Sequence, residues 1–530
     1  MTTSESPSPE SGAPRGGVPD TDGPGPVVRT ASGAVRGRRE QGLSVFRGIP
    51  FAAPPVGAAR FQAPRPPRPW DGVREAYAFG PPPPQETGFL GRTAQLPAPQ
   101  TDDWLTVNVW TPDPDPAAAR PVMVWIYGGA FKLGHGGQPG YDPRHLVHEG
   151  DVVVVTFNYR VGMEGFAHWD GAPANRGLLD QVAALEWVQQ NITAFGGDPA
   201  QVTVFGESAG AGSIASLLAM PRARGLFRRA VAQSVPGTFL SAGLARDLAA
   251  ALAAEAGRGP AAADLAAVEP QRLTEAGAAL GAKMAQYTDR WGQVAPTTVP
   301  FAPVVDGEIL PTTPWEALAA GTAREVDLLV GHNRDEYRLF HIMSGRYGRI
   351  TGDLAAATLR LYAPGGEAGE KAYRAAYPEA SAEQLFERVQ TDWLFAIPTL
   401  RLAEAQHTGG GRAHVYELTW PAPESGGLMG ACHALDIPLL FGTYGADLGG
   451  LLFPGGRPTP EAERLSVFMR GAWTAFARTG DPGWPAHDPH TRLVQILDAE
   501  PSVAPYPEER SRRIWEGHGF PPLPLPAPPA

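Results

Sequence analysis

Residues 202–213, VTVFGESAGAGS, are the clearest indication of the fold class of this chain. Apart from Gln201, residues 201–205 (QVTVF) are β-branched or aromatic, which is typical of a short buried strand. The small and apolar residues 208–220 end at a proline and predict a helix. Between the two segments lies the pattern GxSxG, centred on Ser208. Strand, sharp turn and helix in this order predict that Ser208 is a nucleophile exposed on a strained elbow.

The neighbours of Ser208 support this interpretation. A strand and a helix that approach this closely leave almost no room for side chains two positions before and after the serine. Gly206 and Gly210 meet that need, because glycine has no side chain and tolerates strained backbone. Together with Glu207 they are the predicted supporting residues of the elbow.

Strand and helix patterns alternate on both sides of the elbow. Residues 121–127 (PVMVWIY) and 151–158 (DVVVVTFN) are continuous apolar runs, typical of strands that are covered on both faces. Residues 178–192 have helical spacing. The pattern predicts an α/β fold with a large, mostly parallel, doubly wound sheet and helices on both faces. Further strands are predicted at residues 229–234, 326–331 and 414–420, and helical insertions at about 240–290 and 350–410.

A second motif overlaps the elbow. Residues 210–215 (GAGSIA) fit GxGxxA, the fingerprint of a dinucleotide site, which also needs an acidic residue about 20 positions later. Residues 220–246 contain no Asp or Glu, and the glycines fall inside the predicted helix. Close helix packing explains the motif better, so the sequence predicts no nucleotide cofactor.

The composition argues against several other classes of protein. One cysteine among 530 residues cannot form an internal disulfide or a Cys-ligated zinc site, and no metal site is predicted. The charge of −11 argues against a nucleic-acid partner, which usually requires a basic surface. No apolar run reaches the ~18–20 residues of a membrane span. Oligomeric state is left undecided.

The two ends differ from the rest of the chain. Residues 1–26 hold six Pro, five Gly and four Ser and no apolar run, which predicts a disordered lead-in rather than a secretory leader. The last ten residues, PPLPLPAPPA, predict an extended Pro-rich tail over 521–530. We therefore expect one domain over residues 27–520 and a cytoplasmic location.

A nucleophilic serine needs a base, an acid that orients it, and donors for an oxyanion. In chain order the acid and then the histidine follow the serine. The loop after the strand at 326–331 contains Asp335 and Glu336, which spacing alone does not separate. His433 lies between a Gly-rich stretch and an apolar segment and is the favoured base. The other histidines in the permitted order are His332, His341, His407, His414, His487, His490 and His518.

The oxyanion donors are expected after an early strand. Tyr127-Gly128-Gly129-Ala130 ends the strand at 121–127 in a glycine-rich turn. Such a turn leaves backbone N–H groups free to face a ligand.

With these motifs the sequence resembles the type-B carboxylesterase family, which includes bacterial para-nitrobenzyl-type esterases and, more distantly, cholinesterases. The similarity runs from about residue 28 to about residue 520. The matching stretches, in order, are FRGIPFAAPPVGAARF (46–61), DDWLTVNVWTP (102–112), VMVWIYGGAF (122–131), NRGLLDQVAALEWVQQNITAFGGDP (175–199), VTVFGESAGAGS (202–213), PVVDG (303–307), LLVGHNRDEYRLF (328–340) and AWTAFARTGDPGWP (472–485).

The resemblance implies an α/β-hydrolase fold and hydrolysis of a small-molecule carboxylic ester by water through an acyl-enzyme, with no cofactor. It assigns the triad Ser208, His433 and Glu336, preferring Glu336 to Asp335. The implied oxyanion donors are the N–H groups of Gly129, Ala130 and Ala209. Thioesterase, amidase, lactonase or transacylase activity on the same triad stays open. A non-catalytic binding relative is disfavoured, because such proteins usually lack one of the three residues.

The sequence departs from the family pattern in several places. Relatives often carry a cysteine pair where Pro83 and Trp104 stand here, so this loop has no disulfide. Val235 stands where glycine is common, which predicts a changed acyl-side wall. The Gly-Gly-Ala turn is similar to the GGG(A)X class and suggests activity on tertiary-alcohol esters. Cys432 adjoins His433, and we interpret it as a buried filler rather than an oxidant-sensitive thiol.

Overall fold

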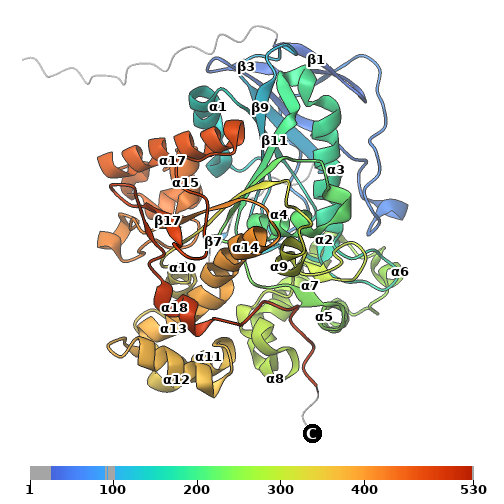
Figure 1. Cartoon of the computed structure of the whole chain (residues 1–530). Coiled ribbons are helices and arrows are strands. Elements are labelled where there is room, and N and C mark those ends of the chain that lie inside the picture. Colours follow the sequence, from blue (N-terminus) through green and yellow to red (C-terminus); the bar gives the residue numbers. More distant parts are fainter. Residues whose placement is uncertain (1–24, 87, 90–91, 94–101, 528–530) are drawn as a thin grey trace, which may run out of the picture.

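The computed structural model describes residues 25–86, 88–89, 92–93 and 102–527 (Figure 1). Apart from residues 25 and 26, the predicted lead-in lies outside this range. The predicted tail is described as far as residue 527. Within it, Leu523 donates a backbone hydrogen bond to Phe239 O at 2.7 Å and accepts one from Ser241 N at 3.0 Å. These bonds attach the described part of the tail to the rest of the molecule.

An eleven-stranded sheet forms the centre of the described chain. Its seven neighbouring strands from β10 to β17 are parallel, and antiparallel strands extend both edges. This confirms the predicted mostly parallel sheet. The strands, in spatial order, are β18 (Ser502–Pro505), β17 (Leu493–Leu497), β16 (Ala413–Leu418), β15 (Asp327–Asn333), β12 (Arg229–Gln233), β11 (Gly197–Glu207), β9 (Arg120–Ile126), β10 (Val153–Phe157), β8 (Thr106–Thr111), β4 (Leu43–Pro50) and β3 (Arg38–Glu40).

Helices cover both faces of this sheet, as predicted (Figure 1). On one side the packed helices are α1 (Arg144–Gly150), α15 (Asp436–Phe441) and α17 (Pro460–Thr479). On the other they are α3 (Arg176–Asn191), α4 (Ala209–Ala219), α9 (Pro314–Ala319) and α14 (Ile397–Thr408). Each layer packs against buried strands: every residue of β10, for example, is fully buried. Burial of a large apolar side chain stabilises the fold by about 1.5–3 kcal/mol.

The two predicted helical insertions are present and pack near one another below the sheet in Figure 1. The first insertion comprises α5 (Ala242–Glu255), α6 (Ala262–Leu265), α7 (Pro270–Lys283) and α8 (Thr288–Trp291). The second comprises α11 (Gly352–Tyr362), α12 (Glu367–Ala376), α13 (Ala382–Thr391) and a π-helical turn, η7 (Asp392–Ala396), before α14. Shorter helices are α2 (Gly162–Gly165), α10 (Arg338–Met343), α16 (Gly449–Leu452) and α18 (Glu509–Ile514).

Several strands lie outside the predicted set, since their pairing depends on distant partners. β4 and β8 form an antiparallel ladder across some 60 residues of chain. Small accessory sheets contain β1 (Val27–Thr30), β2 (Gly33–Arg36) and β5 (Val73–Glu75), then β6 (Gly88–Phe89) with β7 (Arg92–Thr93), and β13 (Leu240–Ser241) with β14 (Val304–Val305).

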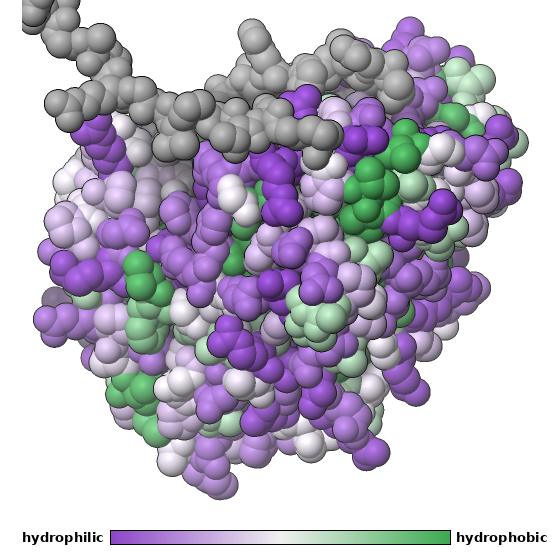
Figure 2. Space-filling model, turned by 90° about the horizontal axis from the view of Figure 1, so that it is seen from above, coloured by the Kyte–Doolittle hydropathy of each residue, from purple (hydrophilic) through white to green (hydrophobic). Residues whose placement is uncertain are grey.

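The exposed surface of the molecule is mainly polar on the face seen in Figure 2. On the face seen in Figure 2, polar residues separate the apolar patches from one another. Within the described part of the chain, no helix combines the length and apolar character needed to cross a membrane.

Candidate active site

Ser208 occupies a strained turn between β11 and α4, with φ 56° and ψ −122°. The flanking glycines are required by the backbone of the neighbouring strand β9. A Cβ on Gly206 would lie 2.5 Å from Ile126 O, and one on Gly210 would lie 2.0 Å from the same oxygen. Both distances are shorter than any real carbon contact, so neither position admits a side chain. The local geometry is that expected of an elbow.

His433 joins Ser208 to the acid side of the site. Its Nε2 lies 2.9 Å from Ser208 Oγ, and its Nδ1 lies 2.6 Å from Glu336 Oε2. His433 is 5% exposed and lies in the loop between β16 and α15. Of the eight histidines that chain order permitted, His433 is the one within hydrogen-bond distance of Ser208 among the residues that the structure describes.

The two candidate acids have different surroundings. Glu336 is fully buried; its Oε1 accepts hydrogen bonds from Ser234 Oγ at 2.6 Å and from Asn333 N at 2.8 Å. Its other oxygen faces His433. Asp335 instead accepts from Ala431 N at 2.9 Å and pairs with Arg334 at 2.9 Å. Asp335 therefore ties two loops together, whereas Glu336 contacts the imidazole.

Glu207 also reaches the imidazole. Its Oε1 lies 3.1 Å from His433 Nε2, and its side chain is 3% exposed. Burial raises the pKa of Glu207 to about 8, with His433 opposing the shift. For His433, burial lowers the pKa, but the carboxylates of Glu207 and Glu336 more than compensate and raise it above its usual value. Glu207 is therefore electrostatically coupled to the imidazole of His433.

Aromatic rings enclose His433. Phe395 stacks on the imidazole with ring centroids 4.4 Å apart, and Phe340 lies tilted at 5.1 Å. Phe395 belongs to η7, a π-helical turn, and such turns are frequent at functional sites. The rings shield the His433 contacts from water, which strengthens the electrostatic interactions there.

The glycine turn, residues 128–134, passes next to Ser208. A Cβ on Gly128 would lie 3.2 Å from Ser208 Cβ. Gly129 and Ala130 have φ of 111° and 54°, so the turn runs through unusual backbone conformations. In the described residues no acceptor takes the N–H groups of Gly129, Ala130 or Ala209. These groups are available to a bound oxygen.

Sequence reasoning missed Ser234, the residue that hydrogen-bonds Glu336. Its φ of 59° is strained, and its backbone N donates to Gly331 O at 2.7 Å. A signal existed: Ser234 directly follows β12, the parallel neighbour of β15, whose exit loop carries Glu336. Side chains at the carboxyl ends of adjacent parallel strands meet at one edge of the sheet.

Other predicted features have plain structural explanations. The GxGxxA motif lies in α4, where a Cβ on Gly212 would meet Pro236 at 2.9 Å, so close packing accounts for it. Cys432 is fully buried, and burial raises the pKa of its thiol. Val235 is fully buried and donates its N–H to Thr399 Oγ1 at 2.9 Å. Among the described residues no cluster of His, Cys, Asp or Glu could hold a metal ion.

Several known proteins are similar to this chain over nearly its whole length. The model of the carboxylesterase family matches residues 24–508. The chain is 39% identical over 500 residues to the para-nitrobenzyl esterase of Bacillus subtilis (strain 168), covering 92% of this chain and 98% of that protein. It is 35% identical over 495 residues to the phenmedipham hydrolase of Pseudarthrobacter oxydans, covering 90% and 96%.

A solved structure is also similar to this chain. The crystal structure of a carboxylesterase from Geobacillus stearothermophilus at pH 6.2 superposes with a TM-score of 0.79 at 36% identity, covering 92% of this chain and 99% of that one. This degree of similarity extends over nearly the whole of both chains. The chain therefore belongs to the carboxylesterase family of α/β-hydrolase enzymes.

Proposed function

We propose that this enzyme hydrolyses carboxylic esters through the triad Ser208, His433 and Glu336. The observation that carries the proposal is the double hydrogen bond of His433, with one ring nitrogen on Ser208 and the other on Glu336. A base held between a nucleophile and an orienting acid is the arrangement that serine hydrolases need.

The chemistry follows in two stages. His433 Nε2 takes the proton of Ser208 Oγ, which attacks the ester carbonyl. The resulting oxyanion accepts hydrogen bonds from the N–H groups of Gly129, Ala130 and Ala209; loss of one such donor costs roughly 2.7–4 kcal/mol in the barrier. His433 then protonates the leaving alcohol, and the acyl-enzyme forms. Water activated by the same imidazole releases the acid.

Glu336 keeps the imidazole in the productive tautomer. Its contact with Nδ1 requires a proton on that nitrogen, so Nε2 stays free to accept the serine proton. It also stabilises the imidazolium that forms during each transfer. Ser234 and the N–H of Asn333 hold the far oxygen of the carboxylate and so fix its orientation.

A substrate panel tests the proposal. The para-nitrobenzyl esterase among the relatives suggests nitroaromatic esters as probes. We expect turnover of p-nitrophenyl acetate and butyrate by the wild-type enzyme. A fluorophosphonate should label Ser208 stoichiometrically. Faster turnover of matched thioesters, amides or lactones, or alcohol transfer in place of hydrolysis, would reassign the reaction, and absence of all of them would indicate a binding protein.

The nucleophile variant is the decisive control. Ser208→Ala should lose roughly four to six orders of magnitude in kcat, as nucleophile variants of serine hydrolases do, with its circular dichroism and Tm retained. Activity that survives in the purified variant overturns the assignment.

Paired tert-butyl and n-butyl esters test whether the enzyme accepts tertiary alcohols. The cytoplasmic location stays a prediction for fractionation to check.

A further inference from the structure

Residues 81–86 (PPPPQE), called the strap below, lie against the glycine turn. The amide of Gln85 pairs with both backbone groups of Gly134. Its Oε1 accepts a hydrogen bond from Gly134 N at 2.7 Å, and its Nε2 donates one to Gly134 O at 2.9 Å. Gln85 is 7% exposed and Gly134 is buried, so these bonds are shielded from water. One side chain thus joins segments 49 positions apart.

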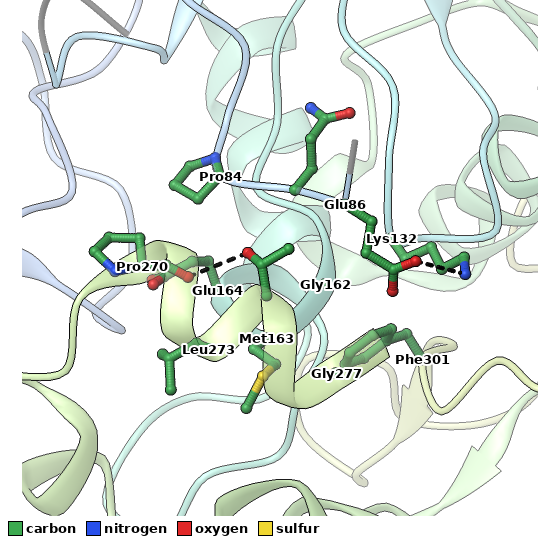
Figure 3. Close-up of a pocket in the computed structure, with 12 residues that line it drawn as sticks. Pro84, Glu86, Lys132, Gly162, Met163, Glu164, Pro270, Leu273, Gly277 and Phe301 are labelled. Carbon is green, nitrogen blue, oxygen red and sulfur yellow. Dashed lines mark hydrogen bonds and ion pairs between the residues drawn. The ribbon is translucent and has the colours of Figure 1, made fainter. Parts of the chain in front are cut away.

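Two further contacts hold the ends of the strap. Lys132 Nζ lies 3.0 Å from Glu86 Oε2, with both side chains 16% exposed. Figure 3 shows these two groups pointing toward each other beside a pocket that is also lined by residues of α2 and α7. At the other end, Asn158 donates to Pro81 O at 3.0 Å and accepts from Gly136 N at 2.8 Å. Because Cys432 is the single cysteine of the chain, these polar contacts act where no disulfide can.

The glycine turn needs such support. Ala130 and Phe131 have φ of 54° and 57°, a region that residues with a Cβ rarely adopt and keep only when their surroundings hold them there. Gly134 packs back onto the start of the turn: a Cβ there would lie 2.5 Å from a Tyr127 ring carbon and 2.8 Å from Gly128 O. A shift of Gly134 therefore moves Gly128 and the residues that follow it.

We propose that Gln85 is a positioning residue for ester hydrolysis, acting through Gly134 to aim the N–H groups of Gly129 and Ala130 at the substrate oxygen. The inference rests on the proposed function. The side-chain hydrogen bonds of Gln85 go to Gly134 and to Pro83 O, not to Ser208. It fixes the end of the turn, and that in turn fixes the donors at its beginning.

The consequence is a loss specific to the transition state. In Gln85→Ala the buried N–H and C=O of Gly134 lose their partners, which is unfavourable enough to displace the turn. Misaimed donors bind the oxyanion more weakly but leave ground-state binding alone. We expect kcat to fall by about 10- to 100-fold, less than the 10²–10³ of a donor removed outright. KM should stay within about threefold.

The test compares wild type, Gln85→Ala and Gln85→Glu in the full-length enzyme. Each is assayed for kcat and KM on p-nitrophenyl butyrate. Each is also titrated with a trifluoromethyl ketone, whose serine adduct carries an oxyanion, and with the matching methyl ketone, which stays uncharged. We expect the inhibition constant of the trifluoromethyl ketone to rise in step with the fall in kcat/KM, and the methyl ketone to bind all three alike. Gln85→Glu keeps the acceptor and should fall between the other two.

Gln406→Ala is the matched control. Gln406 is also buried, at 1% exposure, and donates to Ala323 O at 3.0 Å and Val326 O at 2.8 Å, at the amino end of β15. It should lower Tm without weakening the trifluoromethyl ketone. Wild-type kcat and inhibition in Gln85→Ala, or an equal loss of inhibition in Gln406→Ala, overturns the proposal. If Gln85→Ala does not fold, Gln85→Glu decides in the same way. A wild type that hydrolyses no ester refutes the proposed function instead.

Discussion

Asp335 and Glu336 are adjacent in the chain, yet their carboxylates serve different partners. Glu336 is aimed at His433 Nδ1, whereas Asp335 is neutralised by Arg334 and by a backbone N–H. Glu336→Gln should therefore lower kcat by about 10³–10⁴, because an amide can present the wrong partner to the imidazole and stabilise the wrong tautomer. Steady-state kinetics on p-nitrophenyl butyrate measures the effect.

Asp335→Asn is the matched comparison for that variant. It should retain kcat within about tenfold, since the removed charge faces away from the imidazole, and its cost should be seen in Tm instead. Equal losses of kcat in the two variants would contradict the assignment of Glu336.

Glu207 should set the pH range of activity. A charged Glu207 favours the protonated imidazole, which cannot act as a base. Glu207→Gln removes one of the carboxylates that raise the pKa of His433, so the acidic limb of kcat/KM should move to lower pH. The shift should be about one unit, equivalent to roughly 1.4 kcal/mol of charge interaction. Profiles of kcat/KM from pH 5 to pH 10 at ~0.15 M salt measure it.

The same variant has a signature in stability. The pKa of Glu207 is raised from its ordinary 4.5 to about 8, so its contribution to stability is present below pH 4.5 and is lost as pH rises through about 8. The free energy of unfolding of Glu207→Gln should therefore fall less over this interval. Glu417→Gln is the control: that carboxylate is also fully buried with a raised pKa. An acidic limb that moves as far in Glu417→Gln as in Glu207→Gln would contradict a specific effect on His433.

At the scale of elements, the elbow depends on contact between α4 and β9. Gly210→Ala would place a Cβ 2.0 Å from Ile126 O, so the helix must move. We expect destabilisation of about 2–3 kcal/mol, in the upper range for overpacking, together with a loss of activity. Gly471→Ala provides the contrast, because Gly471 lies exposed in α17 with nothing within 4 Å of a Cβ. It should stabilise by about 0.5–1 kcal/mol. Urea unfolding measures both, and a neutral Gly210→Ala would refute the packing argument.

The elements also show what can be predicted from the sequence. Strands such as β9 and β10 were predictable because their apolar runs are continuous and local. β11 begins four residues before the predicted strand, at Gly197, because that residue pairs with Arg120 across an irregularity in the ladder. Long-range pairing of this kind has no local signature. The same holds for β4 and β8, whose partners are distant in the chain.

The residues of the candidate site likewise differ in how well the local sequence predicts them. Ser208 was predictable because strand, glycines and helix are contiguous, and His433 from chain order and spacing. The choice of Glu336 over Asp335 needed the family resemblance, since adjacent residues are distinguished only by the direction in which the loop turns. Gln85 and Ser234 act through contacts across the fold, with sequence separations of 49 and 102. Such contacts appear only once the sheet is assembled.

At the scale of the whole molecule, the parallel strand order gathers the site. Loops at the carboxyl ends of neighbouring strands converge on one edge of the sheet, which is where ligands bind in open α/β folds. Five of the seven parallel strands contribute one group each: Gly129 after β9, Ser208 after β11, Ser234 after β12, Glu336 after β15 and His433 after β16. The site therefore exists only when the central sheet is complete, so activity and global folding should be lost together.

The single cysteine, Cys432, allows this joint loss of activity and folding to be measured. Cys432 belongs to the His433 loop, where its backbone forms a β-bridge with Asp335, and it is fully buried. Burial raises the pKa of its thiol, so in the native enzyme it should not react with a thiol reagent such as DTNB. We expect one thiol per chain in denaturant and a native labelling rate at least about 10³-fold slower, set by opening of the fold. Inactivation by urea should parallel the exposure of Cys432, and millimolar reductant should leave both midpoints unchanged. Fast labelling of active enzyme would show instead that the His433 loop opens independently of the sheet.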